Sequence, residues 1–221
     1  MINICKGKEN VSKMRLRKVA GAQELLLKSK NYISNPEEYK GTWEKVFDNS
    51  HEIHLEIGTG KGDFIIAKAL AHPEINFIGM EKESSVLVRA VEKLGDKNIE
   101  NLRFLCYDAE KIREVFDKEI TTLYLNFSDP WPKNRHAKRR LTSPIFLSSY
   151  DSIFKGKKHI IHKTDNILLF AYSLEMLSKH GYTLEKVSLD LESSGIENYQ
   201  TEYEKRFIEQ GYKINYVEAI K

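Results

Sequence analysis

Short apolar stretches alternate with longer segments of helical periodicity along most of the chain. The apolar stretches that predict strands cover residues 51–57, 76–80, 102–106, 121–127, 159–164, 182–190 and 212–220. The segments that predict helices cover residues 63–71, 84–94, 166–180, a short stretch around 110–117 and another near 202–210. Ahead of them, residues 14–30 predict an amphipathic helix, which ends before the turn-forming residues Pro36 and Gly41.

Strands that alternate with helices predict an α/β fold, in which a doubly wound, mostly parallel sheet of the Rossmann-like kind has helices on both faces. We expect the seven predicted strands to form one sheet, and the close spacing of the last ones allows one antiparallel member. No repeat or linker divides the chain, so residues 14–221 are predicted to form a single domain with an N-terminal helical segment.

The composition describes a soluble protein: 41% of the 221 residues are hydrophobic and 30% are charged. No apolar run reaches the roughly 18 residues that cross a bilayer, so we expect no membrane partner. The N-terminus lacks the apolar core of a secretion signal. Two cysteines, Cys5 and Cys106, form neither a disulfide framework nor a zinc site on their own. These features favour a cytoplasmic protein.

The net charge of +3 hides a concentrated basic segment, KNRHAKRR, at residues 133–140. Its five Lys and Arg side chains leave the rest of the chain at −2, and a weaker basic stretch lies at residues 13–18. Such clusters are typical of phosphate contacts with nucleic acid. Taken alone, the segment is more typical of a solvated surface loop.

Three glycines, Gly58, Gly60 and Gly62, follow the first strand of the alternating region and precede its helix. In open α/β sheets, ligands bind at such a turn, although a tight strand–helix connection looks similar. The GxGxG spacing differs from the GxGxxG that favours a dinucleotide pyrophosphate. Asp63, which begins the helix, also disfavours a diphosphate because like charges repel.

Acidic residues accompany the carboxyl ends of the first three of these strands. Glu81 is placed to accept hydrogen bonds from ribose hydroxyls, and Asp108 is placed to hold an adenine ring. Glu56 lies inside an apolar strand, where a carboxylate is costly to bury without a partner, and an amino-acid ammonium would suit it. Binders of ammonium, ribose and adenine in series describe S-adenosylmethionine better than NAD. Solvated strand-end carboxylates remain the alternative for Glu81.

The fourth of these strands leads into FSDPWPK, where Pro130 and Pro132 stiffen the turn that carries Asp129 and Trp131. Two later segments have purely structural interpretations. Thr164 or Asp165 would cap the helix at 166–180, and TEYE at residues 201–204 fits a capping box.

The motifs LEIGTGKG, FSDPWPK, RHAKRRL, HKTDN and TEYE occur in this order. Over residues 14 to 217 the chain resembles the bacterial tRNA (guanine-N7)-methyltransferase family. The resemblance implies a class I methyltransferase fold that uses S-adenosylmethionine to methylate guanine N7 at position 46 of the tRNA variable loop. Because N7 carries a lone pair and no proton, the reaction requires no general base.

The resemblance also assigns residues. Glu56 with its glycine loop, Glu81, Asp108 and Asp129 would bind the cofactor, and Asp129 would also be catalytic. The residues that would bind substrate are Lys133, Asp165, Thr201, Glu202, Tyr203 and Glu204. Those that would contact RNA are Arg135, His136, Lys138, Arg139 and Arg140. No metal is implied, and residues 1–13 precede the similarity as a disordered extension or an upstream start. Two features depart from the family pattern: the sequence KVAGAQE that follows MRLR, and Asn134 in place of a basic residue. Both bear on how the protein contacts RNA.

Three alternatives remain at this point. An NAD-dependent oxidoreductase shares the glycine turn and Glu81, and a non-catalytic RNA-binding module shares the basic segment. Methylation of another nucleobase atom is the nearest alternative. The tRNA-binding protein is expected to be a monomer or a homodimer.

Overall fold

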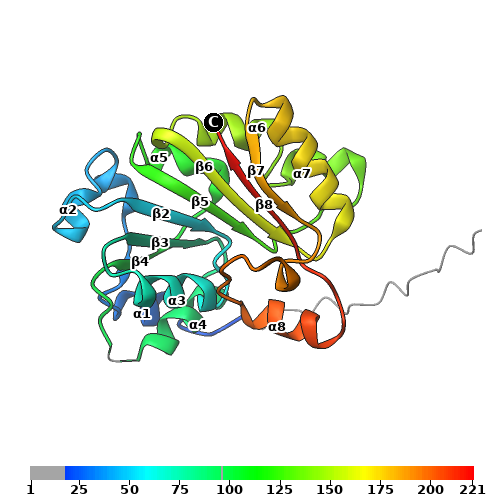
Figure 1. Ribbon diagram of the computed structural model, residues 1–221. Helices are drawn as coiled ribbons and strands as arrows, with labels where there is room; N and C mark the ends of the chain where they lie inside the picture. Colours follow the sequence, from blue (N-terminus) through cyan, green and yellow to red (C-terminus); the bar gives the residue numbers. More distant parts are fainter. Residues whose placement is uncertain (1–17, 96) are drawn as a thin grey trace, which may run out of the picture.

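An eight-stranded sheet in the order β1-β4-β3-β2-β5-β6-β8-β7 runs through the computed structural model, which describes residues 18–95 and 97–221 (Figure 1). The strands are β1 (Tyr32–Ile33), β2 (Ile53–Ile57), β3 (Asn76–Glu81), β4 (Leu102–Cys106), β5 (Ile120–Asn126), β6 (Phe154–Thr164), β7 (Thr183–Ser188) and β8 (Asn215–Ile220). All neighbours are parallel except β8, which runs antiparallel to both β6 and β7. The predicted doubly wound sheet with one antiparallel member is confirmed. An eighth strand, β1, has only two residues, too few for a periodic pattern.

Helices cover both faces of the sheet: α1, α3 and α4 lie on one side, and α5, α6 and α7 on the other (Figure 1). The α-helices are α1 (Ala22–Leu27), α2 (Glu44–Phe47), α3 (Asp63–Ala71), α4 (Ser84–Leu94), α5 (Ile112–Val115), α6 (Pro144–Tyr150), α7 (Ile167–Lys179) and α8 (Glu202–Glu209). The 3₁₀-helices are η1 (Pro36–Tyr39), η2 (Ala109–Lys111), η3 (Asn134–Arg139) and η4 (Glu192–Ser194).

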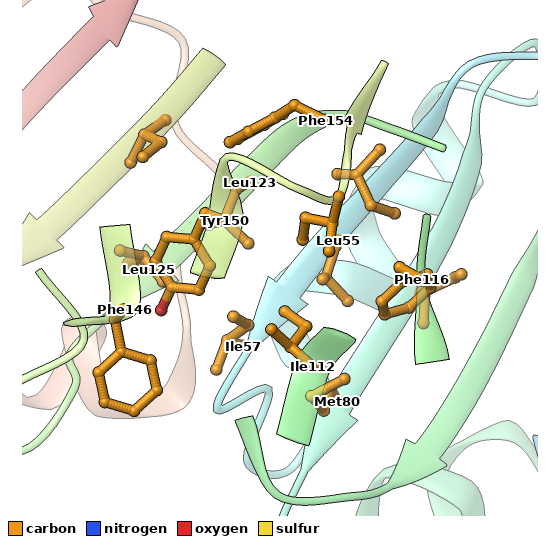
Figure 2. Close-up of a cluster of buried hydrophobic side chains, with 14 of the residues drawn as sticks. Leu55, Ile57, Met80, Ile112, Phe116, Leu123, Leu125, Phe146, Tyr150 and Phe154 are labelled. Carbon is orange, nitrogen blue, oxygen red and sulfur yellow. The ribbon is translucent and has the colours of Figure 1, made fainter. Parts of the chain in front are cut away.

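Two hydrophobic cores result from the alternation of side chains along the central strands. Leu55 of β2 and Leu123 and Leu125 of β5 point to one face and pack with Phe146 and Tyr150 of α6 (Figure 2). On the other face, Tyr124 of β5 packs with residues of α3 and α4. The central strands are therefore buried on both faces, which explains their near-continuous apolar sequence.

The N-terminal part differs from the sequence prediction. Within the described residues, the helix expected over 14–30 is limited to Ala22–Leu27. Gly21 precedes it with φ of 70°, a left-handed conformation that stops the helix from extending toward the N-terminus. Residues 1–17, which include the predicted extension and most of the second basic stretch, lie outside the described part of the chain.

Helix α6 was not predicted from the periodicity. Its signal is Ser143 followed by Pro144 at the first helical position, where the missing N–H of proline costs nothing. Strand β6 also starts at Phe154, five residues before the predicted boundary at His159.

The strand order reverses between β2 and β5, the two central parallel neighbours. Connections from their carboxyl ends leave in opposite directions, which opens a crevice at this edge of the sheet. The glycine loop after β2 and the FSDPWPK loop after β5 flank that crevice. The fold thus brings the predicted cofactor and catalytic residues to one edge.

Candidate active site

The glycine loop wraps the carboxyl end of β2 with all three glycines at positive φ: Gly58 at 77°, Gly60 at 58° and Gly62 at 78°. A Cβ on Gly62 would lie 2.7 Å from Cβ of Ala90, so this glycine permits the close packing of α3 on α4. Gly58 has no atom within 4 Å of its own Cβ position. The loop therefore presents bare backbone toward the crevice.

Glu56 is buried beneath this loop with 1% of its surface exposed. Oε2 accepts a hydrogen bond of 2.6 Å from the Thr59 hydroxyl, and Oε1 accepts one of 2.7 Å from the Asn126 amide. Burial raises the pKa of Glu56 to about 7, although both hydrogen bonds oppose the shift. The buried carboxylate thus has partners within the protein, and it is poised to change protonation state near neutral pH.

Asn126 is a site residue that the sequence reasoning missed. It ends β5, is 6% exposed, and lines both cavities of the crevice. Its Nδ2 donates to Glu56, whereas Oδ1 is buried without a hydrogen-bond partner among the described residues. Such an atom is costly unless a donor binds it. A polar residue at the carboxyl end of an otherwise apolar strand was the signal.

Glu81 and Asp108 occupy the neighbouring strand ends and line a cavity of about 540 Å³. Glu81 braces the glycine loop, because its Oε2 accepts a hydrogen bond of 3.1 Å from the Gly60 N–H. Burial raises the pKa of Glu81. Burial acts in the same direction on Asp108, but the Lys82 ammonium, 2.6 Å away, and the Glu110 N–H outweigh it and lower the pKa.

The loop after β5 contains two non-glycine residues in the left-handed region, Phe127 with φ of 51° and Trp131 with φ of 41°. Asp129 lies between them and lines the same cavity as Glu81. Burial raises the pKa of Tyr203 to about 12, and the nearby carboxylates of Asp165 and Asp129 contribute to the shift. The fold therefore gathers Asp129, Asp165 and Tyr203 from three separate elements.

The TEYE segment begins α8 with the predicted capping box, which is confirmed. The Thr201 hydroxyl accepts a hydrogen bond of 2.9 Å from the Glu204 N–H. Thr201, Glu202 and Tyr203 line a second cavity of about 270 Å³ beside the glycine loop. Glu202 pairs with Lys61 of that loop at 2.8 Å. Glu204, in contrast, is completely buried, so direct contact with substrate would require its exposure.

The predicted cap of the preceding helix was wrong. Neither Thr164 nor Asp165 caps α7: its first turn is capped by Asn166, whose side chain accepts a hydrogen bond of 2.9 Å from the Leu169 N–H. Asp165, which lies one residue earlier, is free of that role. Burial raises its pKa.

The basic segment forms η3 next to the loop that carries Asp129. Lys133, Arg135, Lys138 and Arg139 are exposed there. The His136 ring packs edge-on against Trp131 with the ring centres 5.8 Å apart. Of these cations, Arg139 lines the cavity of about 540 Å³ that Asp129 also lines, and the others precede it along the chain at exposed positions suited to contact with a phosphate backbone.

Comparison with known proteins identifies the family. Residues 50–217 match the model of a family described as "Putative methyltransferase". The tRNA (guanine-N(7)-)-methyltransferase of Listeria welshimeri is 50% identical over 190 residues, which are 85% of this chain and 89% of the relative. The chain belongs to the tRNA (guanine-N7)-methyltransferase family. The corresponding protein of Lachnoclostridium phytofermentans is 46% identical over 211 residues, 94% of this chain and 99% of the relative.

Solved structures support the same fold for this methyltransferase. A solved protein described as an "Antibiotic Related Methyltransferase" superimposes on this chain with a TM-score of 0.63 at 17% identity. The superposition covers 82% of this chain and 92% of the other. A 16S rRNA (adenine(1408)-N(1))-methyltransferase variant from Catenulisporales acidiphilia, solved with its cosubstrate SAM, gives 0.58 at 16% identity and covers 84% and 90% of the two chains. At these identities the likeness shows the fold alone.

S-adenosylmethionine is the cofactor of the methyltransferase, and the crevice suits its chemistry. The two cavities adjoin, because both are lined by Gly58, Asn126 and Phe127. Carboxylates at one end match ribose hydroxyls and adenine, and bare glycine backbone lies between. The partnerless Oδ1 of Asn126 and the Glu56 carboxylate suit a cationic amino-acid group. Methyltransferase membership removes the NAD-dependent oxidoreductase and the non-catalytic module from the alternatives.

In residues 18–95 and 97–221, no three side chains of His, Cys, Asp or Glu cluster in a way that could hold a metal ion. Over the same residues, every helix is too short or too polar to cross a membrane.

Proposed function

We propose that this methyltransferase transfers the methyl group of S-adenosylmethionine to N7 of guanine at position 46 in the variable loop of tRNA. The proposal rests on one observation: Asp129 in the cofactor cavity and the basic segment are close neighbours along the chain. Asp129 lines the cofactor cavity, and η3 begins five residues later with exposed cations. A nucleotide whose phosphates lie on η3 therefore has its base within reach of the crevice.

The cofactor, when bound, supplies an electrophilic methyl group. Since guanine N7 is already nucleophilic, the protein contributes alignment rather than a base. Asp129 and Asp165 accept hydrogen bonds from the N1–H and the exocyclic amine of guanine. These bonds strengthen as the ring gains positive charge, which is differential binding of the transition state.

Aromatic side chains complete the guanine site. The Phe127 and Tyr203 rings lie with their centres 5.2 Å apart, and Tyr203 is 43% exposed. An exposed aromatic ring beside two carboxylates is suited to stack on an extruded base. Tyr203, Thr201 and Glu202 therefore bind the target nucleotide, with Lys133 at its phosphate.

In the remaining assignments, acidic residues bind the cofactor and basic residues bind tRNA. Glu81 and Asp108 hold the ribose and adenine of the cofactor, and Glu56 and Asn126 hold its ammonium beside Gly58 and Gly60. Arg135, His136, Lys138 and Arg139 contact tRNA phosphates. We place the enzyme in the cytoplasm, as one domain over residues 14–221 that is monomeric or homodimeric. Light scattering after size exclusion tests the oligomeric state.

Paired transcripts test the target position. Two versions of one tRNA that differ only in guanosine or adenosine at position 46 are incubated with labelled S-adenosylmethionine. We expect label in the guanosine transcript and none in the other. Equal labelling of both would refute the assignment to position 46.

A further inference from the structure

We propose that Arg140 is a positioning residue of the methyl transfer: its guanidinium fixes the Pro130–Trp131 turn, and through that turn Asp129. This inference rests on the proposed function. It separates Arg140 from the rest of the basic segment, which the family resemblance assigns to RNA contact.

The guanidinium of Arg140 is turned toward the catalytic loop. Its Nε donates a hydrogen bond of 3.0 Å to the carbonyl of Pro130, and Nη2 donates one of 3.0 Å to the carbonyl of Trp131. The same group lies over the Tyr172 ring of α7, with Cζ 4.3 Å from the ring centre. The planar fork thus spans two consecutive carbonyls while a ring supports its face.

The loop it holds needs such support. Trp131, a bulky residue with φ of 41°, and Phe127, with φ of 51°, lie on either side of Asp129. Conformations of this kind persist only where the surroundings impose them. Pro130 and Pro132 have no N–H, so the turn has fewer backbone donors of its own with which to hold its shape.

The backbone of Arg140 is also held by hydrogen bonds. Its N–H donates to Ala137 at 3.1 Å, and its carbonyl accepts from the Ser143 N–H at 2.9 Å, just before α6. Arg135, in contrast, is exposed. Arg139 also touches the loop, with Cζ 4.9 Å from the centre of the Trp131 ring, but it makes no hydrogen bond to the two carbonyls that Arg140 holds.

Two substitutions at Arg140 separate positioning from phosphate contact. Arg140→Lys keeps the charge but cannot span both carbonyls, and Arg140→Gln removes the charge. We expect both to lower kcat at saturating tRNA by about tenfold or more, in line with the loss of one charged hydrogen bond. We also expect Arg140→Gln to leave the slope of log Kd for tRNA against log salt unchanged. Arg135→Gln provides the reference for a phosphate contact and reduces that slope by about one.

Arg113→Gln is the matched control, because the Arg113 guanidinium also donates to a backbone carbonyl, that of Ser148 at 2.7 Å, in α6. It should change neither kcat nor the salt slope. Tyr172→Leu removes the ring that supports the Arg140 guanidinium and changes no charge, so it should also lower kcat. This variant tests the proposal if the Arg140 variants fail to fold. Wild-type kcat in Arg140→Lys, or a slope in Arg140→Gln reduced as in Arg135→Gln, would overturn the proposal.

Tryptophan fluorescence tests the positioning without any methylation assay. Trp43 is 0% exposed, so acrylamide quenching reports mainly on Trp131, which is partly exposed. Arg140→Lys should change this quenching, and Arg113→Gln should not. A wild-type enzyme that does not methylate tRNA would refute the proposed function, but the quenching measurement would still test whether Arg140 holds the turn. Unchanged quenching in Arg140→Lys would refute the positioning role alone.

Discussion

Lys163 and Glu204 form a buried ion pair, with Nζ 2.9 Å from Oε2 and side chains that are 2% and 0% exposed. Lys163 belongs to β6 and Glu204 to the first turn of α8, so the pair joins the sheet to the TEYE segment. The Lys163 ammonium also donates to the Asn198 side chain at 2.8 Å and to the Tyr199 carbonyl at 3.2 Å. This cluster fixes the position of α8, and therefore of Tyr203, at the crevice.

Glu204→Gln is predicted to lower the free energy of unfolding by about 3 kcal/mol, because it leaves the Lys163 ammonium buried without its counter-charge. Urea denaturation measures the change. Glu209→Gln, on the exposed surface of the same helix, should stay within about 0.5 kcal/mol of wild type. A Glu204→Gln protein as stable as the Glu209→Gln control would contradict this role of the pair.

Glu56 should make stability depend on pH. Its folded pKa of about 7 lies above its ordinary value of 4.5, so the folded state binds a proton more tightly than the unfolded chain. The stability from this group is fully present below pH 4.5 and is lost as the pH rises to 7, a change of about 3 kcal/mol. Unfolding free energies of wild type minus those of Glu56→Gln should show this fall. A difference that is constant with pH would contradict the shift.

Asn126 should contribute to binding of the amino-acid portion of the cofactor and not to binding of its adenosine portion. We expect Asn126→Ala to weaken S-adenosylhomocysteine binding about 10- to 100-fold, the loss of a hydrogen bond to a charged group. Methylthioadenosine, which lacks the amino-acid portion, should bind the variant as it binds wild type. Glu81→Gln is the counterpart and should weaken both ligands through the shared ribose. Calorimetry that shows equal losses of both ligands in Asn126→Ala would remove Asn126 from the ammonium site.

Asp129→Ala should lower kcat at saturating tRNA and cofactor about 10- to 100-fold, because a bond that strengthens in the transition state is lost. Asp117→Ala, at an exposed position beyond the other end of the sheet, is the control and should behave as wild type. Single-turnover methylation measures the effect. Wild-type kcat in Asp129→Ala would exclude a catalytic role.

The sequence predicted the elements well where periodicity or composition decides them. Helices 63–71 and 84–94 and strand 102–106 have the predicted bounds, because their apolar faces meet the core. Elements with too few residues for a pattern, such as β1, were missed. The glycine turn and its carboxylates were placed at one edge because parallel strands align their carboxyl ends there.

The direction of individual side chains was beyond the reach of the sequence. Arg140 and Arg135 look equivalent in KNRHAKRR, yet one binds the loop carbonyls and the other faces solvent. Glu204 and Glu202 are two residues apart, and the helical twist turns one into the core and the other toward Lys61. Contacts between distant elements, such as Lys163 with Glu204, depend on packing that no local pattern contains.

Nucleoside analysis of methylated tRNA tests the central claim most directly. Bulk tRNA is incubated with the enzyme and methyl-labelled S-adenosylmethionine, digested to nucleosides and separated. We expect the label in 7-methylguanosine alone, and about 10- to 100-fold less of it with Asp129→Ala at the same enzyme concentration and a short reaction time. Label in any other nucleoside, or none with the wild-type enzyme, would contradict methylation of guanine N7 by this site.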